Sequence, residues 1–257
     1  MKTYLVVLTA LSLSSAWLST ANVKPIPTHR GSFAVVELFT SEGCSSCPPA
    51  ERVLNQINEE QTAKGEPVYV LSFHVDYWNR LGWTDPFSDT AFSDRQRDYA
   101  VAFRSRSIYT PQMVVNGQAE FVGSDKSQAK RRIEQALSTS TAGQVGIGLA
   151  AHHDQTANQA NISWQLDRLP EGAVLNIAVV EDDLGNYVPR GENRGQTLEH
   201  DGVVRVFVTL TPEAVHGSLN VSLPPDLDPT QSGIIAFVQE TRGMHIIGAY
   251  RVPLAQP

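Results

Sequence analysis

The chain has 257 residues, of which 41% are hydrophobic and 18% are charged. That is the composition of a globular protein with hydrophobic cores, and it argues against a disordered or low-complexity chain. The formal net charge of −7, with 20 basic residues that form no run, argues against a nucleic-acid-binding surface.

The N-terminus predicts export. The charged residue Lys2 is followed by an apolar stretch over residues 5–13 and by small residues up to Ala21, a pattern typical of a signal peptide over residues 1–21. The alternative is an uncleaved anchor or a buried first helix, because Lys2 is the only charge of this segment. No later stretch is apolar for long enough to cross a bilayer, so we expect a mature protein that spans no membrane. Its expected location is periplasmic or secreted, where disulfides persist.

The first expected elements form a βαβ unit. Residues 22–31 contain prolines and no periodicity, and are expected to be a lead-in segment. A strand is expected over residues 33–39, an apolar run broken only by Glu37, as in a strand buried on both faces. A helix is expected to begin at Pro48, because proline suits the first turn and apolar residues then recur at helical spacing. A second strand over residues 68–75 completes the unit, with a right-handed crossover.

The next elements complete an expected first domain. A second helix is predicted over about residues 87–103. The dipeptide Asn116-Gly117 then indicates a type I′ turn between two short antiparallel strands. A closing helix is predicted over residues 125–137, with a polar N-cap. The sequence therefore predicts an α/β domain over residues 32–140.

The second half of the chain has a different pattern. Short runs of alternating, β-rich sequence are separated by Gly, Pro, Asn and Asp, with no helical pattern between them. They predict an antiparallel β-sandwich-like domain over residues 144–257, after a linker over residues 138–144. The runs cover residues 145–151, 161–166, 174–180, 203–210, 218–223, 234–238 and 245–252.

The only two cysteines, Cys44 and Cys47, lie between the first predicted strand and the first predicted helix. A helix N-terminus presents unpaired N–H groups and about half a positive charge to the first sulfur, which favours the thiolate. We expect Cys44 to be the exposed, attacking thiol with a lowered pKa, and Cys47 to resolve the mixed disulfide. The ring that they close is too small for stapling the fold to be its main role. Zinc or copper binding uses the same spacing and is an alternative.

Three segments carry a resemblance to known proteins. Residues 36–50, which read VELFTSEGCSSCPPA, resemble the secreted bacterial proteins of domain-of-unknown-function family 1223 (DUF1223), as do residues 73–78 and 110–117. Residues 33–137 also resemble the thioredoxin-like superfamily. The resemblance implies a thioredoxin-like fold with a Cys-x-x-Cys motif, and a cis-proline at Pro111 that shapes a substrate groove beside the disulfide.

Further residues are candidates for the site. Glu37, a carboxylate inside an apolar strand, is expected to exchange a proton with Cys47, or alternatively to face solvent. Thr110, Tyr77 and Trp78 are expected to line the substrate groove, although the two aromatic residues alternatively cover the edge of the sheet.

Glu42 is expected on an exposed loop, where its charge would oppose thiolate formation. His74 ends the second strand and would complete a Cu(I) or Zn(II) site with Cys44 and Cys47, the alternative being an ordinary hydrogen-bonded histidine. A set of polar residues in the second half has no catalytic spacing and is expected to form salt bridges to the first domain: Arg190, Glu192, Asn193 and Arg205.

The leading hypothesis is an exported thiol:disulfide oxidoreductase in which Cys44 attacks, Cys47 resolves and Pro111 shapes the groove. Its partners would be protein thiols or disulfides and a redox partner protein, and no cofactor is expected. One alternative is a Cu(I)- or Zn-binding or metal-delivery protein that uses the two cysteines and His74. Another is a non-enzymatic protein whose β-rich half binds a partner.

Overall fold

The computed structural model describes residues 26–255, so the predicted signal peptide lies outside the described residues. The helices are α1 (Pro48–Lys64), α2 (Thr90–Ala102) and α3 (Lys126–Ser138), with short 3-10 helices η1 (Asp76–Leu81) and η2 (Pro229–Gln231). The strands are β1 (Ala34–Thr40), β2 (Val68–His74), β3 (Gln112–Val115), β4 (Ala119–Val122), β5 (Ile147–Asp154), β6 (Gln159–Leu166), β7 (Ala173–Glu181), β8 (Leu184–Val188), β9 (Gln196–His200), β10 (Val203–Leu210), β11 (His216–Ser222), β12 (Ser232–Glu240) and β13 (Ile246–Pro253). No helix among these described residues is long and apolar enough to cross a membrane.

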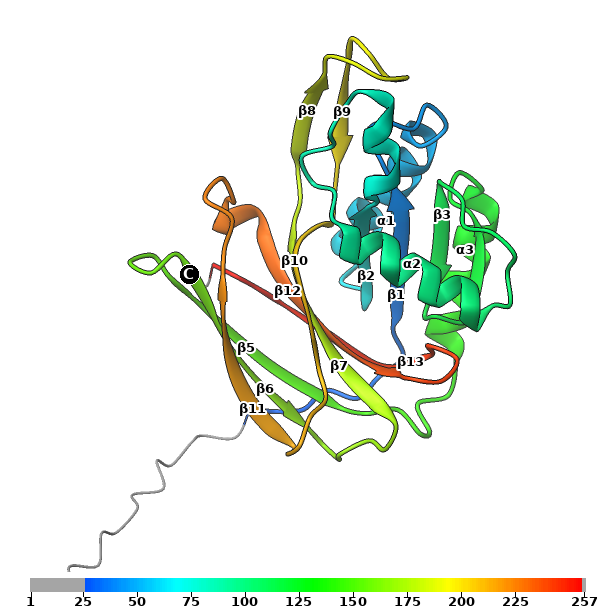
Figure 1. Ribbon diagram of the computed structural model, residues 1–257. Helices are drawn as coiled ribbons and strands as arrows, with labels where there is room; N and C mark the ends of the chain where they lie inside the picture. The colour runs from blue at the N-terminus through cyan, green and yellow to red at the C-terminus, as the bar shows by residue number, and fades with distance from the viewer. Residues whose placement is uncertain (1–25, 256–257) are drawn as a thin grey trace, which may run out of the picture.

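One mixed sheet runs through both halves of the chain (Figure 1). Its eight strands have the order β13-β12-β7-β10-β2-β1-β3-β4. A three-stranded sheet, β11-β6-β5, lies against the β12 and β7 part of it, and β8 and β9 form a separate hairpin that projects beyond the end of the large sheet. The chain therefore does not divide its strands between two independent sheets at residues 138–144.

The expected fold class, an α/β thioredoxin-like domain followed by a separate antiparallel sandwich, is wrong. The structure is mostly β, with 40% strand against 23% helix, and no separate thioredoxin-like domain is present among the described residues. The two halves join where β10 pairs in parallel with β2, at Val203 opposite Ser72. There the amide of Ser72 donates to the carbonyl oxygen of Gly202 at 2.7 Å. The expectation failed because pairing between residues 131 positions apart, Val203 and Ser72, leaves no local pattern in the sequence.

Helices cover both faces of the β2-β1-β3 part of the sheet, which explains why β1 is buried along its whole length. Alternate residues of β1 point to opposite faces. Val36 and Leu38 pack against α1 and α3, whereas Val35 and Phe39 pack on the α2 side with Tyr99. This two-sided cover places the C-terminal end of β1 and the N-terminal end of α1 next to each other, where the cysteines lie.

Most local predictions match the elements in the structure. The seven predicted runs of the second half are the strands β5, β6, β7, β10, β11, β12 and β13. The turn at Asn116 and Gly117 has positive φ at both residues, 49° and 63°, as a type I′ turn requires. The hairpin β8–β9 was not predicted, and it is the element that completes the site.

Candidate functional site

Cys44 and Cys47 form a disulfide at the N-terminus of α1. Their Cα atoms are 5.4 Å apart. Cys47 is the N-cap residue of the helix, and Pro48 and Pro49 form the start of its first turn. Prolines fit there because the first N–H groups of a helix have no intrahelical partners. The positive end of the helix dipole is therefore directed at the sulfur pair.

Both cysteines are buried. The exposed fraction is 0% for Cys44 and 1% for Cys47, so the expectation of an exposed attacking sulfur is wrong. Ser45 and Ser46 between them are exposed. Loops from two distant parts of the chain contact the cysteine loop, which is why its sequence alone could not reveal this burial.

The first of these is the loop between β8 and β9, residues 189–195, which we call the cover loop. The side-chain amide of Asn193 donates to the carbonyl oxygens of Glu42 at 2.8 Å and Cys44 at 2.9 Å. The Glu192 carboxylate accepts from the Ser45 hydroxyl at 2.7 Å and from its amide at 2.9 Å. These hydrogen bonds from Ser45 hold the pKa of Glu192 below its usual value. The cover loop therefore binds the cysteine loop by hydrogen bonds, where salt bridges were expected.

The second contact is the segment that contains the cis peptide bond Thr110–Pro111, an isomer that was predicted. The Thr110 hydroxyl donates to Cys44 Sγ at 3.4 Å and accepts from Trp78 Nε1 at 2.8 Å. Thr110, Trp78 and Cys44 are thus brought together. Tyr77 instead donates its hydroxyl proton to Gln96 Oε1 on α2, at 3.1 Å.

Glu37 lies on the other face of the sheet from α1. Its carboxylate accepts from Arg95 Nε at 2.6 Å and from the Tyr99 hydroxyl, both on α2. Arg95 in turn lies over aromatic rings, those of Phe73, Tyr99, Phe207 and Phe237. The structure therefore gives Glu37 a buried ion pair in the core and places it away from the face that carries α1 and Cys47.

Glu42 is fully buried, so its expected position on an exposed loop is wrong. Its carboxylate accepts from Trp83 Nε1 at 2.7 Å and from Asn186 Nδ2 at 2.8 Å. His200 Nε2 lies 3.3 Å from the same carboxylate. Asn186 and His200 belong to the β8–β9 hairpin, which therefore supplies the polar partners that a buried carboxylate needs.

Two histidines meet beside this carboxylate. The rings of His74, at the end of β2, and His200, at the end of β9, pack edge to face with centroids 4.9 Å apart. His74 Nδ1 is 2.8 Å from Asp85 Oδ2, and His200 Nδ1 is 3.5 Å from Glu51 Oε2. Glu51 lies on α1, one turn after Cys47.

The electrostatics of this group couple its members. Burial alone lowers the pKa of His200, but the charge of Glu51 and the hydrogen bond to Glu42 outweigh burial and raise that pKa to about 10. Burial alone raises the pKa of Glu51, and the facing charge of His200 reverses this and lowers it. The carboxylates therefore create a buried site that favours a positive charge between them.

A model of one protein family matches residues 35–239, and its description is "Protein of unknown function (DUF1223)". The chain belongs to the DUF1223 family. The match spans the cysteine pair, the segment around Pro111 and the β8–β9 hairpin. The resemblance inferred from the sequence motifs is therefore confirmed at the level of the family.

Two solved structures similar to this DUF1223 protein come from bacteria. Protein AGR_C_4864 from Agrobacterium tumefaciens has 25% sequence identity and a TM-score of 0.58, over 89% of this chain and 97% of that one. HBP35 of Porphyromonas gingivalis has 13% identity and a TM-score of 0.58, over 89% of this chain and 77% of that one, a likeness of fold alone. A comparison with curated proteins finds no match.

Several residues of the DUF1223 site were not predicted: Glu51, Asp85, Asn186 and His200. One available signal was the spacing of Cys47 and Glu51, because residues i and i+4 share a helix face. No comparable signal existed for the hairpin, whose strands are five residues long and carry polar or glycine residues at most positions.

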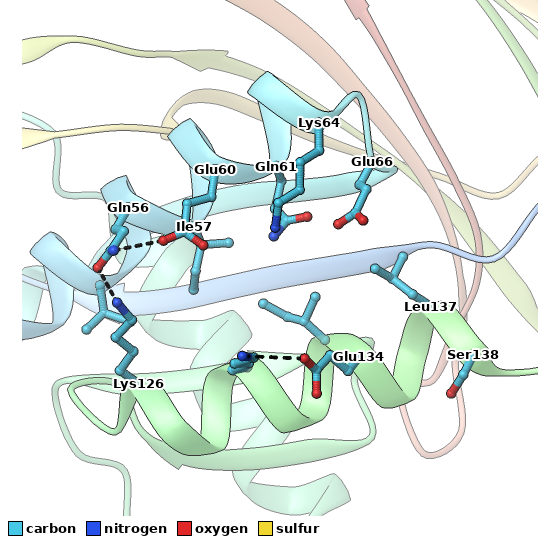
Figure 2. A pocket seen from close by; sticks show the side chains of 13 residues that line it. Gln56, Ile57, Glu60, Gln61, Lys64, Glu66, Lys126, Glu134, Leu137 and Ser138 are labelled. Carbon is cyan, nitrogen blue, oxygen red and sulfur yellow. Dashed lines mark hydrogen bonds and ion pairs between the residues drawn. The ribbon is translucent and has the colours of Figure 1, made fainter.

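A hollow of about 530 Å³ between α1 and α3 lies apart from these residues (Figure 2). Long polar side chains from both helices point into it and contact one another. Lys126 Nζ donates to Gln56 Oε1 at 2.7 Å, and Lys130 lies 3.9 Å from Glu134. No residue of the cysteine or histidine groups lines this hollow, so it is a groove between two amphipathic helices and is separate from the site.

Proposed function

We propose that this DUF1223 protein exchanges disulfides with protein thiols through Cys44 and Cys47, as an exported thiol:disulfide oxidoreductase. The observation that carries the proposal is the disulfide between these cysteines at the N-terminus of α1. Helix N-termini stabilise thiolates, and a thiolate is both the attacking and the leaving species in exchange. The small ring also argues against a mainly structural role for the bond.

In the reducing direction, the Cys44 thiolate attacks one sulfur of a substrate disulfide and the other sulfur leaves as a thiolate. Cys47, as thiolate, then attacks Cys44 Sγ, releases the second substrate thiol and restores the Cys44–Cys47 disulfide. The same steps in reverse oxidise a dithiol substrate. A redox partner protein returns the pair to its starting state. Thr110 and Pro111 flank Cys44, where they would border the bound peptide.

The burial of Cys44 adds a requirement to this proposal. A substrate sulfur must approach along the S–S axis, and Cys44 has no exposed surface in the closed structure. The cover loop is held by the side chains of Asn193 and Glu192, and the Glu192 carboxylate is at the surface. We therefore expect this loop to open before exchange.

The proposed place of action is the periplasm or the extracellular space. The support is the signal-peptide pattern of residues 1–21 and the use of both cysteines in one disulfide. Oxidising compartments preserve such bonds, whereas the cytosol keeps thiols reduced.

The test is capture of substrates in periplasmic extract. The Cys47→Ser variant keeps the attacking sulfur and lacks the resolving one, so we expect it to accumulate mixed disulfides that a reductant releases. Cys44→Ser is the matched control and should trap none. The wild-type protein should also reduce or oxidise a model protein disulfide. Equal trapping by the two variants, or a Cys44–Cys47 potential well below about −300 mV, would refute exchange at this site.

A further inference from the structure

Next to the disulfide, polar atoms that lack hydrogen-bond partners converge in the interior. His74 Nε2, His200 Nδ1 and both carboxylate oxygens of Glu51 are buried and have no hydrogen-bond partner, although His200 Nδ1 and Glu51 Oε2 form an ion pair at 3.5 Å. Ligand atoms of these three residues all lie within 4.8 Å of one another. Folded proteins rarely bury polar atoms without a partner, so several that face one another indicate a missing ligand.

From this arrangement we propose that Glu51, His74 and His200 bind a divalent transition-metal ion, with zinc as the ion of choice. Two imidazole nitrogens and one carboxylate oxygen are a common protein ligand set for zinc, which accepts a water or a hydroxyl as its fourth ligand. The buried hydroxyl of Thr40, at the end of β1, also has no hydrogen-bond partner. The cysteines are not part of this ligand set.

The second layer of contacts orients both imidazoles for this role. The Asp85 carboxylate can only accept, so the 2.8 Å contact places the proton of His74 on Nδ1 and leaves a lone pair on Nε2. The Glu42 carboxylate lies 3.3 Å from His200 Nε2, so Nδ1 is the nitrogen left for a metal, which would displace the proton there. Metal-binding histidines usually donate their other ring N–H to a carboxylate, a backbone carbonyl or a water. Here the nitrogens left for a metal are His74 Nε2 and His200 Nδ1, neither of which has a hydrogen-bond partner.

The distances need only a small contraction. Zinc lies about 2.0–2.1 Å from nitrogen and oxygen ligands, so tetrahedral ligand atoms are about 3.3 Å apart. His200 Nδ1 and Glu51 Oε2 are already 3.5 Å apart. The other separations within the group, all at most 4.8 Å, would have to shorten to about 3.3 Å when the ion binds.

Charge and access also favour a cation. In the described residues, the ion-pair partners of Glu42, Glu51 and Asp85 are the two histidines. A divalent ion would add positive charge among these three buried carboxylates. His200 also lines a surface hollow between α1 and the β8–β9 hairpin, together with the acidic residues Glu59, Asp183, Glu199 and Asp201. This hollow is a route by which a cation reaches His200.

The inference does not depend on disulfide exchange, and its test separates the two. Full-length protein is treated with a chelator, and Zn²⁺ is titrated in competition with a chromophoric chelator. We expect one equivalent to bind. The variants Glu51→Gln and His200→Gln should lose more than about 100-fold in affinity, beyond the usual cost of altering a residue outside the ligand set. His216→Gln, which alters an exposed histidine on β11, is the matched control and should bind as the wild type does.

The double variant Cys44→Ser/Cys47→Ser should keep full zinc affinity while losing all disulfide exchange. Circular dichroism reports whether each variant is folded. If the ligand variants fail to fold, the absorption spectrum of the wild-type protein with Co²⁺ shows whether sulfur is a ligand. Nitrogen and oxygen ligands give no thiolate-to-metal charge-transfer band, so we expect none. Absence of binding by folded wild-type protein, retention of binding by folded His200→Gln, or loss of binding in the cysteine double variant would each overturn the proposal.

Discussion

The side-chain amide of Asn193 lies 2.9 Å from the carbonyl oxygen of Cys44, although 149 positions separate these residues in the sequence. It also donates to the carbonyl oxygen of Glu42 at 2.8 Å. This buried amide thus makes two of the hydrogen bonds that hold the cover loop against the loop that carries the disulfide, and Glu192 accepts two more from Ser45. Access to the sulfur and stability of the hairpin are therefore linked through these contacts.

The change Asn193→Ala should accelerate reduction of the disulfide, because it removes the two hydrogen bonds of Asn193 and leaves the cover loop held by those of Glu192. It should also lower the free energy of unfolding by about 1–3 kcal/mol, since the carbonyl group of Glu42 loses the Asn193 amide and that of Cys44 keeps only the amide of Cys47. Thiol release under a small-molecule reductant measures the first effect, and chemical denaturation measures the second. Asn220→Ala, at an exposed position of β11, is the control. Identical reduction rates for the three proteins would show that this loop does not limit access.

Glu192 should make the stability of the cover loop depend on pH. Hydrogen bonds from Ser45 hold its pKa below the ordinary value of 4.5. A carboxyl whose pKa is lowered by folding stabilises the folded state fully above its unfolded pKa, and that contribution disappears as the pH falls through the folded pKa.

We therefore expect wild-type protein to exceed Glu192→Gln in melting temperature at neutral pH, and the difference to shrink below pH about 4.5. The chemical shift of the Ser45 amide should titrate with the pKa that Glu192 has in the folded protein, below 4.5. Glu213→Gln, at an exposed position, should show neither effect. A difference between wild type and Glu192→Gln that is constant from neutral to acidic pH would contradict the assignment.

Removing only one member of the buried ion pair between Arg95 and Glu37 should strongly lower the free energy of unfolding. Arg95→Met leaves the Glu37 carboxylate without its counter-charge in the core, and we expect a loss of about 3–5 kcal/mol in the free energy of unfolding. Removing both charges in Arg95→Met/Glu37→Leu should restore much of that loss. Arg97→Met, in an exposed ion pair with Asp94, should change stability by less than about 0.5 kcal/mol. A double variant as unstable as Arg95→Met would argue against an uncompensated charge as the cause.

Gly117 should tolerate no side chain. Its φ is +63°, and a Cβ atom there would lie 1.9 Å from the carbonyl oxygen of Met244. Gly65, with a φ of +65°, has no atom within 4 Å of such a Cβ.

Gly65→Ala should therefore cost only the backbone strain of about 1–2 kcal/mol, whereas Gly117→Ala should cost clearly more because the backbone at Met244 must move. Thermal and chemical denaturation measure both. Equal losses at the two positions would show that strain alone matters and that the turn at residues 116–117 is free to shift away from Met244.

The local elements of this protein were predictable because they depend on neighbouring residues. Alternation identified β6 and β7, the helical spacing after Pro48 identified α1, and Asn116-Gly117 identified a hairpin. The fold class was not predictable in the same way. It depends on the pairing of β10 with β2, which joins the halves into one sheet, and hydrogen bonds between distant strands require no particular side chain.

The same distinction applies to the candidate site, where some residues were predictable from the local sequence and others were not. Cys44 and Cys47 were evident from their spacing and position, and His74 from its place at the end of a predicted strand. Glu51 was assigned no role, although it follows Cys47 by four residues and therefore lies on the same side of α1. His200 and Asn193 were out of reach, because the hairpin that carries them has no alternating pattern and acquires its position only by packing against α1 and the cysteine loop.

The sequence alone determined which two cysteines lie close enough to pair, where the helix beside them begins, and that the chain belongs to the DUF1223 family, because motifs and spacings are local properties. The tertiary structure decided that the sulfurs are buried, that Glu37 is paired in the core, and that His74 meets His200 and Glu51. These outcomes depend on contacts between residues 58 to 149 positions apart in the chain. Their formation is governed by packing of the whole molecule and not by any one stretch of it.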